Sequence, residues 1–121
     1  MATILIADDS PSAVVLLKRI LEPLGHEIVV CTDGAQAART VLDVRPDLVI
    51  LDVVMPKQNG FEVCRLLKGN PTTAAIPVFL VTSMDREPDR YWGKKQGADE
   101  YLVKPVDATV LVEKVRARLS P

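Results

Sequence analysis

The chain has 121 residues, of which 48% are hydrophobic and 26% are charged, values typical of one globular domain. Its formal net charge of −1 excludes a general attraction to nucleic acid or to anionic membranes. No apolar run approaches the roughly 18 residues of a membrane span, and no secretory pattern follows Met1. We therefore expect one domain over residues 1–121, located in the cytoplasm, with no direct nucleic-acid or membrane partner.

Five short apolar segments alternate along the chain with amphipathic ones. Three of them, residues 3–7, 48–51 and 78–81, are almost continuously apolar, as expected for strands that helices cover on both faces. The other two, residues 27–31 and 100–103, have more polar flanks, which suits edge strands.

The segments between these strands show the period of helices. Apolar residues at helical spacing form one stripe from Val14 to Leu24 and another from Ala108 to Leu119. Gly25 is expected to end the first of these helices. Strict alternation of five strands with five helices implies right-handed crossovers, and so an α/β fold with a doubly wound parallel sheet.

The two cysteines, Cys31 and Cys64, lie far apart and belong to no CxxC or Cys/His pattern. This spacing indicates neither a zinc site nor a disulfide framework. We expect both to be small buried side chains with free thiols.

Side chains able to bind a cation, or to accept or bind a phosphoryl group, follow four of the five predicted strands. They are Asp8 and Asp9 after the first, then Asp52, Thr82 and Lys104. The carboxyl ends of parallel strands lie side by side at one edge of a sheet, and ligands bind in the crevice outside them. We therefore expect these five side chains to converge.

Three carboxylates in one crevice repel one another and need a cation. Lys104 offsets one of their charges and leaves about two, which matches one Mg²⁺ held by oxygen ligands. An aspartate beside such an ion can act as a nucleophile and accept a phosphoryl group as an acyl phosphate. A lysine and a threonine at the same edge can then stabilise charge on the phosphoryl oxygens.

Four segments together carry a family resemblance: ILIADDSP at the first strand, LVILDVVMPKQNGFEVCR around Asp52, VFLVTS at Thr82, and GADEYLVKP at Lys104. With them the whole chain resembles a bacterial two-component response-regulator receiver domain of the CheY-like type. The resemblance implies a flavodoxin-like sheet of five parallel strands in the order 2-1-3-4-5, flanked by five helices. The stretch YWGKKQGADEYLVKPV is also similar to single-domain receivers of twitching-motility pathways.

The resemblance implies a role for each polar position at the strand ends. Asp52 is the phosphoacceptor, Lys104 pairs with it and with the phosphoryl group, and Thr82 moves towards the phosphate. Asp9 and Asp52 bind Mg²⁺ through their carboxylates, and Val54 binds it through its backbone carbonyl. Asp8 contacts the ion mainly through a water. Tyr101 is the aromatic residue that rotates after Thr82, and the bond from Lys104 to Pro105 is expected to be cis.

The resemblance also implies the partners. A histidine kinase or a phosphotransfer protein supplies the phosphoryl group, and phosphorylation switches a signalling face. The domain is then no enzyme beyond its own phosphoryl transfer and autodephosphorylation, and Mg²⁺ is its one cofactor.

We expect a downstream protein to bind the face formed by residues 88–119. The helix behind Pro88 is predicted to be weak, because Gly93 lies inside it and Gly97 closes it, and each glycine costs about 1 kcal/mol relative to alanine. A weak helix beside the switch suits a bistable element. Candidate partner contacts are aromatic and cationic, namely Trp92, Lys94 and Lys95. The alternative is that Trp92 packs into the core.

Three other interpretations fit part of the pattern. A receiver-fold interaction module would work without phosphorylation. A flavin-binding module needs an amide-lined loop after the first strand, where Asp8 and Asp9 would repel the flavin phosphate. A haloacid-dehalogenase-like phosphatase resembles the pattern at Asp52 but has a second aspartate where Val54 stands.

Overall fold

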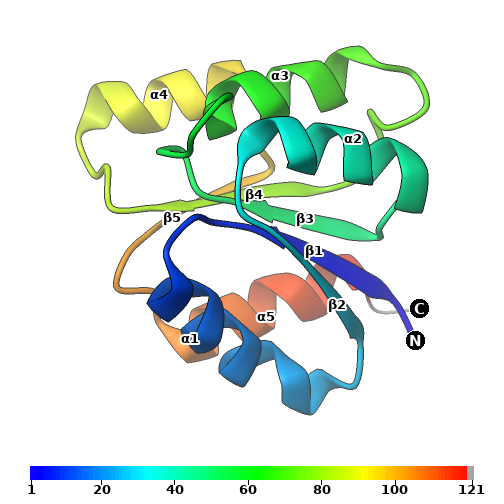
Figure 1. The fold of residues 1–121 in the computed structure, drawn as a ribbon. Helices are drawn as coiled ribbons and strands as arrows, with labels where there is room; N and C mark the ends of the chain where they lie inside the picture. The colour runs from blue at the N-terminus through cyan, green and yellow to red at the C-terminus, as the bar shows by residue number, and fades with distance from the viewer. Residues whose placement is uncertain (120–121) are drawn as a thin grey trace.

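The computed structural model describes residues 1–119 and is built around a five-stranded parallel sheet (Figure 1). Its strands are β1 (Thr3–Ala7), β2 (Glu27–Cys31), β3 (Leu48–Leu51), β4 (Val78–Thr82) and β5 (Glu100–Val103). They lie in the order β2-β1-β3-β4-β5, which confirms the order that the resemblance implied. The strands with polar flanks, β2 and β5, form the edges, as predicted. The predicted domain range of 1–121 extends two residues past the described part of the chain.

Helices cover both faces of the sheet (Figure 1). One face carries α2 (Gly34–Val44), α3 (Gly60–Gly69) and α4 (Glu87–Lys95), and the other carries α1 (Pro11–Leu21) and α5 (Ala108–Leu119). This is the predicted doubly wound α/β arrangement. Within residues 1–119, none of the helices is long and apolar enough to cross a bilayer.

The sheet divides the interior into two apolar clusters. Successive side chains of a strand point to opposite faces, so Ile4 and Ile6 pack towards α1 and α5 while Leu5 and Ala7 pack towards α2 and α3. The side chain of Phe79 is also fully buried, at 0% exposed. Each large apolar side chain buried in this way contributes about 1.5–3 kcal/mol, which makes the sheet a stable support for the residues at its edges.

Both cysteines are free and buried, as the sequence predicted. Burial raises the pKa of the Cys64 thiol to about 11, so this thiol is protonated at neutral pH. It donates a hydrogen bond to the Gln96 carbonyl at 3.5 Å and thereby connects α3 to the end of α4. Both cysteines thus pack as small buried side chains in the core.

The first helix ends earlier than the sequence predicted. Its apolar stripe predicts a helix up to Gly25, whereas α1 stops at Leu21 and a 3-10 turn follows over Glu22–Leu24. Pro23 lies in that turn and has no N–H with which to continue an α-helical ladder, which explains the early end. The chain then reaches Gly25, which closes the turn before β2.

A partly buried ion-pair cluster holds the amino ends of β4 and β5 against α3. The Lys68 Nζ lies 2.9 Å from Asp99 Oδ2 and also donates hydrogen bonds to two backbone carbonyls of the loop before β4. The Asp99 carboxylate accepts a further hydrogen bond from the Val78 N–H at 2.8 Å. Burial by itself would raise the pKa of Asp99, but these hydrogen bonds and the Lys68 and Arg118 charges outweigh it and lower the pKa.

Replacing Lys68 by methionine should lower the free energy of unfolding by about 1–3 kcal/mol, because the cluster loses its charged donor. Arg65→Met is the matched control on the same helix: Arg65 is exposed, and its replacement should change the free energy by less than about 0.5 kcal/mol. Urea unfolding measures both. Equal losses in the two variants would contradict a special role for the cluster.

The same cluster should make stability depend on pH in the acid range. The pKa of Asp99 is lower in the folded than in the unfolded chain. Its stabilisation is therefore present above the unfolded pKa and is lost as the pH falls through the folded pKa. We expect Asp99→Asn to reduce the difference in unfolding free energy between neutral pH and about pH 3, below the ordinary aspartate pKa.

Candidate functional site

Three aspartates meet at the carboxyl end of the sheet. Asp8 and Asp9 follow β1, and Asp52 follows β3, the strand that pairs with β1 in parallel register. The Asp52 N–H donates a hydrogen bond to the Ala7 carbonyl at 2.9 Å, which extends the pairing to the aspartate itself. One carboxylate oxygen from each of the three lies within 4.8 Å of the other two. The structure therefore brings them together, as the sequence predicted.

Lys104 completes this cluster from the end of β5. Its Nζ lies 2.8 Å from Asp8 Oδ2 and 3.1 Å from Asp52 Oδ2. The resemblance implied the contact with Asp52, and the structure adds Asp8 as a second partner. Burial alone would lower the pKa of Lys104, but the hydrogen bonds and charges of the two aspartates outweigh it and raise the pKa, which keeps the ammonium charged. The peptide bond to Pro105 is cis, as expected.

The donor set fits a hard divalent cation. Three carboxylates and one ammonium leave a net charge of about −2 at this edge. Two oxygens bound to the same Mg²⁺ are at most about 4.2 Å apart, because each Mg–O distance is about 2.1 Å. The limit of 4.8 Å within which the three oxygens lie is close to this value, so the cluster fits an ion of this kind.

Both carboxylate oxygens of Asp8 already accept hydrogen bonds. Its side chain is only 2% exposed, and one of its oxygens accepts the hydrogen bond from Lys104. The other oxygen accepts a hydrogen bond from the Ser10 N–H at 2.9 Å. Asp9, by contrast, is exposed and has its carboxylate open to solvent.

Thr82 and Tyr101 are connected through the backbone of Met84. Thr82 ends β4 with its side chain fully buried, and its Oγ1 accepts a hydrogen bond from the Met84 N–H at 3.4 Å. The Tyr101 hydroxyl donates a hydrogen bond to the Met84 carbonyl at 2.6 Å. The two residues expected to form the switch thus contact the same segment of the loop between β4 and α4.

One close approach near Asp52 escaped the sequence analysis. The Gly60 N–H donates a hydrogen bond to the Val53 carbonyl at 2.8 Å, and a Cβ at Gly60 would overlap the Asp52 carbonyl. A residue without a side chain is therefore required where α3 meets this loop. Asn59 and Glu62 form a capping box that starts α3 there. The Asn-Gly pair was a visible turn signal, but a turn signal does not reveal which backbone it contacts.

The face predicted for a downstream partner carries exposed aromatic and basic side chains. Tyr91 and Trp92 are 63% and 49% exposed, so the alternative in which Trp92 packs into the core is wrong. Lys94 and Lys95 are exposed on the same helix, and the Lys95 Nζ lies 5.8 Å from the centroid of the Tyr91 ring. All four belong to α4, which packs against β5.

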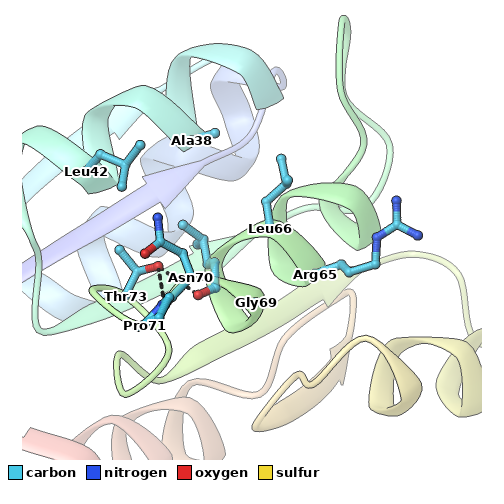
Figure 2. Close-up of a pocket in the computed structure, with 9 residues that line it drawn as sticks. Ala38, Leu42, Arg65, Leu66, Gly69, Asn70, Pro71 and Thr73 are labelled. Carbon is cyan, nitrogen blue, oxygen red and sulfur yellow. Dashed lines mark hydrogen bonds between the residues drawn. The ribbon is translucent and has the colours of Figure 1, made fainter.

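A separate hollow lies between the carboxyl-terminal halves of α2 and α3 (Figure 2). It has a volume of about 500 Å³, with Leu42 of α2 and Leu66 of α3 among the residues that line it. Thr73 lies at its edge and donates a hydrogen bond to the Leu67 carbonyl at 2.7 Å. The residues that line this hollow include no carboxylate, so it lacks the donor set of the acidic cluster.

Comparison with known proteins agrees with this geometry. The family model described as the response regulator receiver domain matches residues 4–116. Protein PilH of Pseudomonas aeruginosa is 43% identical over 120 residues, which cover 99% of each chain. Response regulator PleD of Caulobacter vibrioides is 41% identical over 116 residues, which cover 96% of this chain and 26% of PleD.

The fold is also similar to solved receiver structures. The receiver domain of a signal transduction histidine kinase from Syntrophus aciditrophicus has a TM-score of 0.92 and 39% identity, over 99% of this chain and 91% of that one. The resemblance drawn from four sequence segments is thus confirmed over almost the whole chain, together with the strand order that it implied. The chain belongs to the response-regulator receiver domains, the phosphorylation-dependent signalling domains of two-component systems.

Proposed function

We propose that Asp52 is the phosphoacceptor and that a histidine kinase or a phosphotransfer protein supplies the phosphoryl group. The observation that carries this proposal is the Lys104 ammonium 3.1 Å from Asp52 Oδ2 inside a cluster of three carboxylates. A carboxylate oxygen of Asp52 attacks phosphorus, the bond from phosphorus to the donor breaks, and an acyl phosphate forms. Lys104 stabilises the charge on the phosphoryl oxygens.

In this proposal, the carboxylates of Asp9 and Asp52 and the backbone carbonyl of Val54 would hold the Mg²⁺, and Asp8 would act mainly through a water. When bound, the ion supplies positive charge that neutralises the phosphoryl oxygens. The Val54 N–H donates a hydrogen bond to Asp52 Oδ1 at 3.4 Å, so the loop folds back over the phosphoacceptor. Asp8 also holds Lys104, which keeps the ammonium beside Asp52.

Thr82 and Tyr101 convert the new charge into a change of shape. Phosphorylation replaces a charge of about −1 by one nearer −2 and adds acceptor oxygens. The Thr82 hydroxyl turns to donate to one of them, and Tyr101 adjusts because both residues contact Met84. Autodephosphorylation ends the active state, and the domain acts on no external substrate.

The altered face comprises residues 88–119, where Trp92, Lys94 and Lys95 contact a downstream protein. Their exposure leaves them available, and aromatic and cationic side chains often dominate protein interfaces. The domain works in the cytoplasm without direct contact to nucleic acid or membrane, in keeping with its net charge of −1.

Incubation with acetyl phosphate and Mg²⁺ should add the mass of one phosphoryl group, and Asp52→Asn should abolish this gain because an amide cannot attack phosphorus. Intact-protein mass spectrometry measures the gain. Asp43→Asn, at an exposed position of α2, is the control and should react like the wild type. A wild type that gains no mass would favour the alternative of an interaction module that works without phosphorylation.

Lys104→Met should tighten Mg²⁺ binding while slowing phosphoryl transfer. The variant removes a positive charge beside the carboxylates, and we expect the affinity for Mg²⁺ to rise about fivefold or more from the Coulomb energy between such charges. Transfer from acetyl phosphate should slow by about 10²-fold, as when one stabilising donor is lost. Calorimetry and mass spectrometry measure the two effects. Lys114→Met, which removes an ion pair with Glu100, should leave both unchanged.

Trp92→Ala should leave the domain folded and able to accept phosphate. Half of its side chain is already in solvent, so the unfolding free energy should fall by less than about 2 kcal/mol, against about 3–5 kcal/mol for Phe79→Ala in the core. Urea unfolding compares the two. A loss as large as that of the core variant would show that Trp92 supports the interior and not an interface.

A further inference from the structure

Gly93 faces the sheet from α4, and the ring of Tyr101 lies directly against it. A Cβ built at Gly93 would lie 2.7 Å from Cδ2 and 3.0 Å from Cε2 of that ring. The first distance is shorter than real Cβ contacts allow, so a Cβ and the ring cannot both keep these places. The glycine is also buried, although alanine would be the better helix former.

The same ring is connected to the edge of the sheet where Asp52 lies. Its hydroxyl donates to the Met84 carbonyl, and the Met84 N–H donates to Thr82 Oγ1. Partial burial and the nearby Asp89 charge raise the pKa of Tyr101, and the ring packs against the edge of the apolar cluster below α4. Contacts therefore run without a break from Thr82 to the backbone of α4.

The exposed part of α4 lies next to this contact in the sequence. Trp92 directly precedes Gly93 and is 49% exposed. Arg90, one turn earlier, has its guanidinium carbon 5.7 Å from the centroid of the Tyr101 ring. A change in how α4 rests on the ring would therefore move the side chains that form the predicted output face.

We propose that Gly93 is a positioning residue of the switch: by lacking a side chain it provides the space that the Tyr101 ring occupies, and this contact couples the ring to the placement of α4. The inference rests on the proposed phosphorylation of Asp52 and names the point at which α4 responds to it. Phosphorylation favours the inward ring, and the ring then holds α4 in one position. A side chain at residue 93 forces the ring out of this place and weakens the coupling.

The first test needs no phosphorylation. The chain has two tyrosines, so in a Tyr91→Phe background the NMR signals of labelled tyrosine come from Tyr101 alone. We expect Gly93→Ala to shift these signals towards those of a solvent-exposed tyrosine. Gly69→Ala is the matched control, because a Cβ at Gly69 meets nothing within 4 Å. Unchanged Tyr101 signals in Gly93→Ala would overturn the proposal.

The second test measures the coupling with beryllofluoride and Mg²⁺, which mimic a phosphoryl group on an aspartate. The fluorescence of Trp92, the one tryptophan of the chain, follows the titration. We expect Gly93→Ala to weaken beryllofluoride binding about fivefold or more, the lower end of typical coupling between sites. In a Tyr101→Ala background the same change should have a much smaller effect, because the ring is absent and only the Leu80 Cδ1, 3.1 Å from the Cβ, still has to give way.

The outcomes separate the two proposals. If beryllofluoride does not bind the wild type, the phosphorylation of Asp52 fails. If it binds the wild type and Gly93→Ala equally, the role of Gly93 alone fails. Should Gly93→Ala not fold, the double variant is compared with Tyr101→Ala, and a further loss of beryllofluoride affinity of about fivefold or more in the double variant overturns the proposal.

Discussion

The site depends on the contacts of one ammonium group with two carboxylates. Parallel pairing of β1 with β3 forces Asp8, Asp9 and Asp52 together, and their mutual repulsion would oppose that register if nothing offset it. Lys104 offsets part of it from β5, two strands away from β3. The remaining charge is what a divalent cation matches, so the charge balance of the fold and the chemistry of the site have the same origin.

The fold and the convergence at its edge could be predicted from the sequence because both follow from local patterns. Apolar runs mark the buried strands, and the carboxyl ends of parallel strands meet whatever the details of packing. The end of α1 was mispredicted because the apolar stripe continues past Pro23, which ends the regular hydrogen bonding. The contact of Lys104 with Asp8 depends on the path of a long side chain, which no residue spacing specifies.

Gly60 and Gly93 show what a sequence pattern does not reveal, namely which other element a glycine contacts. From the sequence, Gly93 looks like a defect in a helix, and Gly60 looks like part of a turn. Their neighbours, the Tyr101 ring and the Asp52 carbonyl, lie on other elements. The apolar attachment of α4 is slight: its buried residues are Asp89 and Gly93, whereas α3 buries three larger apolar side chains, Val63, Cys64 and Leu67. A helix with so little apolar anchorage shifts at low cost.

Ion pairs hold β5 at both ends, through Asp99 and Lys68 before the strand and through Lys104 after it. If β5 slid along its own axis, the ion pairs at both ends would break at once. Such a movement of the strand is therefore energetically unfavourable. In the proposed switch, the response to a new charge is therefore lateral: it passes from β5 through the side chain of Tyr101 to α4, which lies against the ring. If the proposed switch operates in this way, a binding protein that touched only β2, at the far edge of the sheet, would be insensitive to its state.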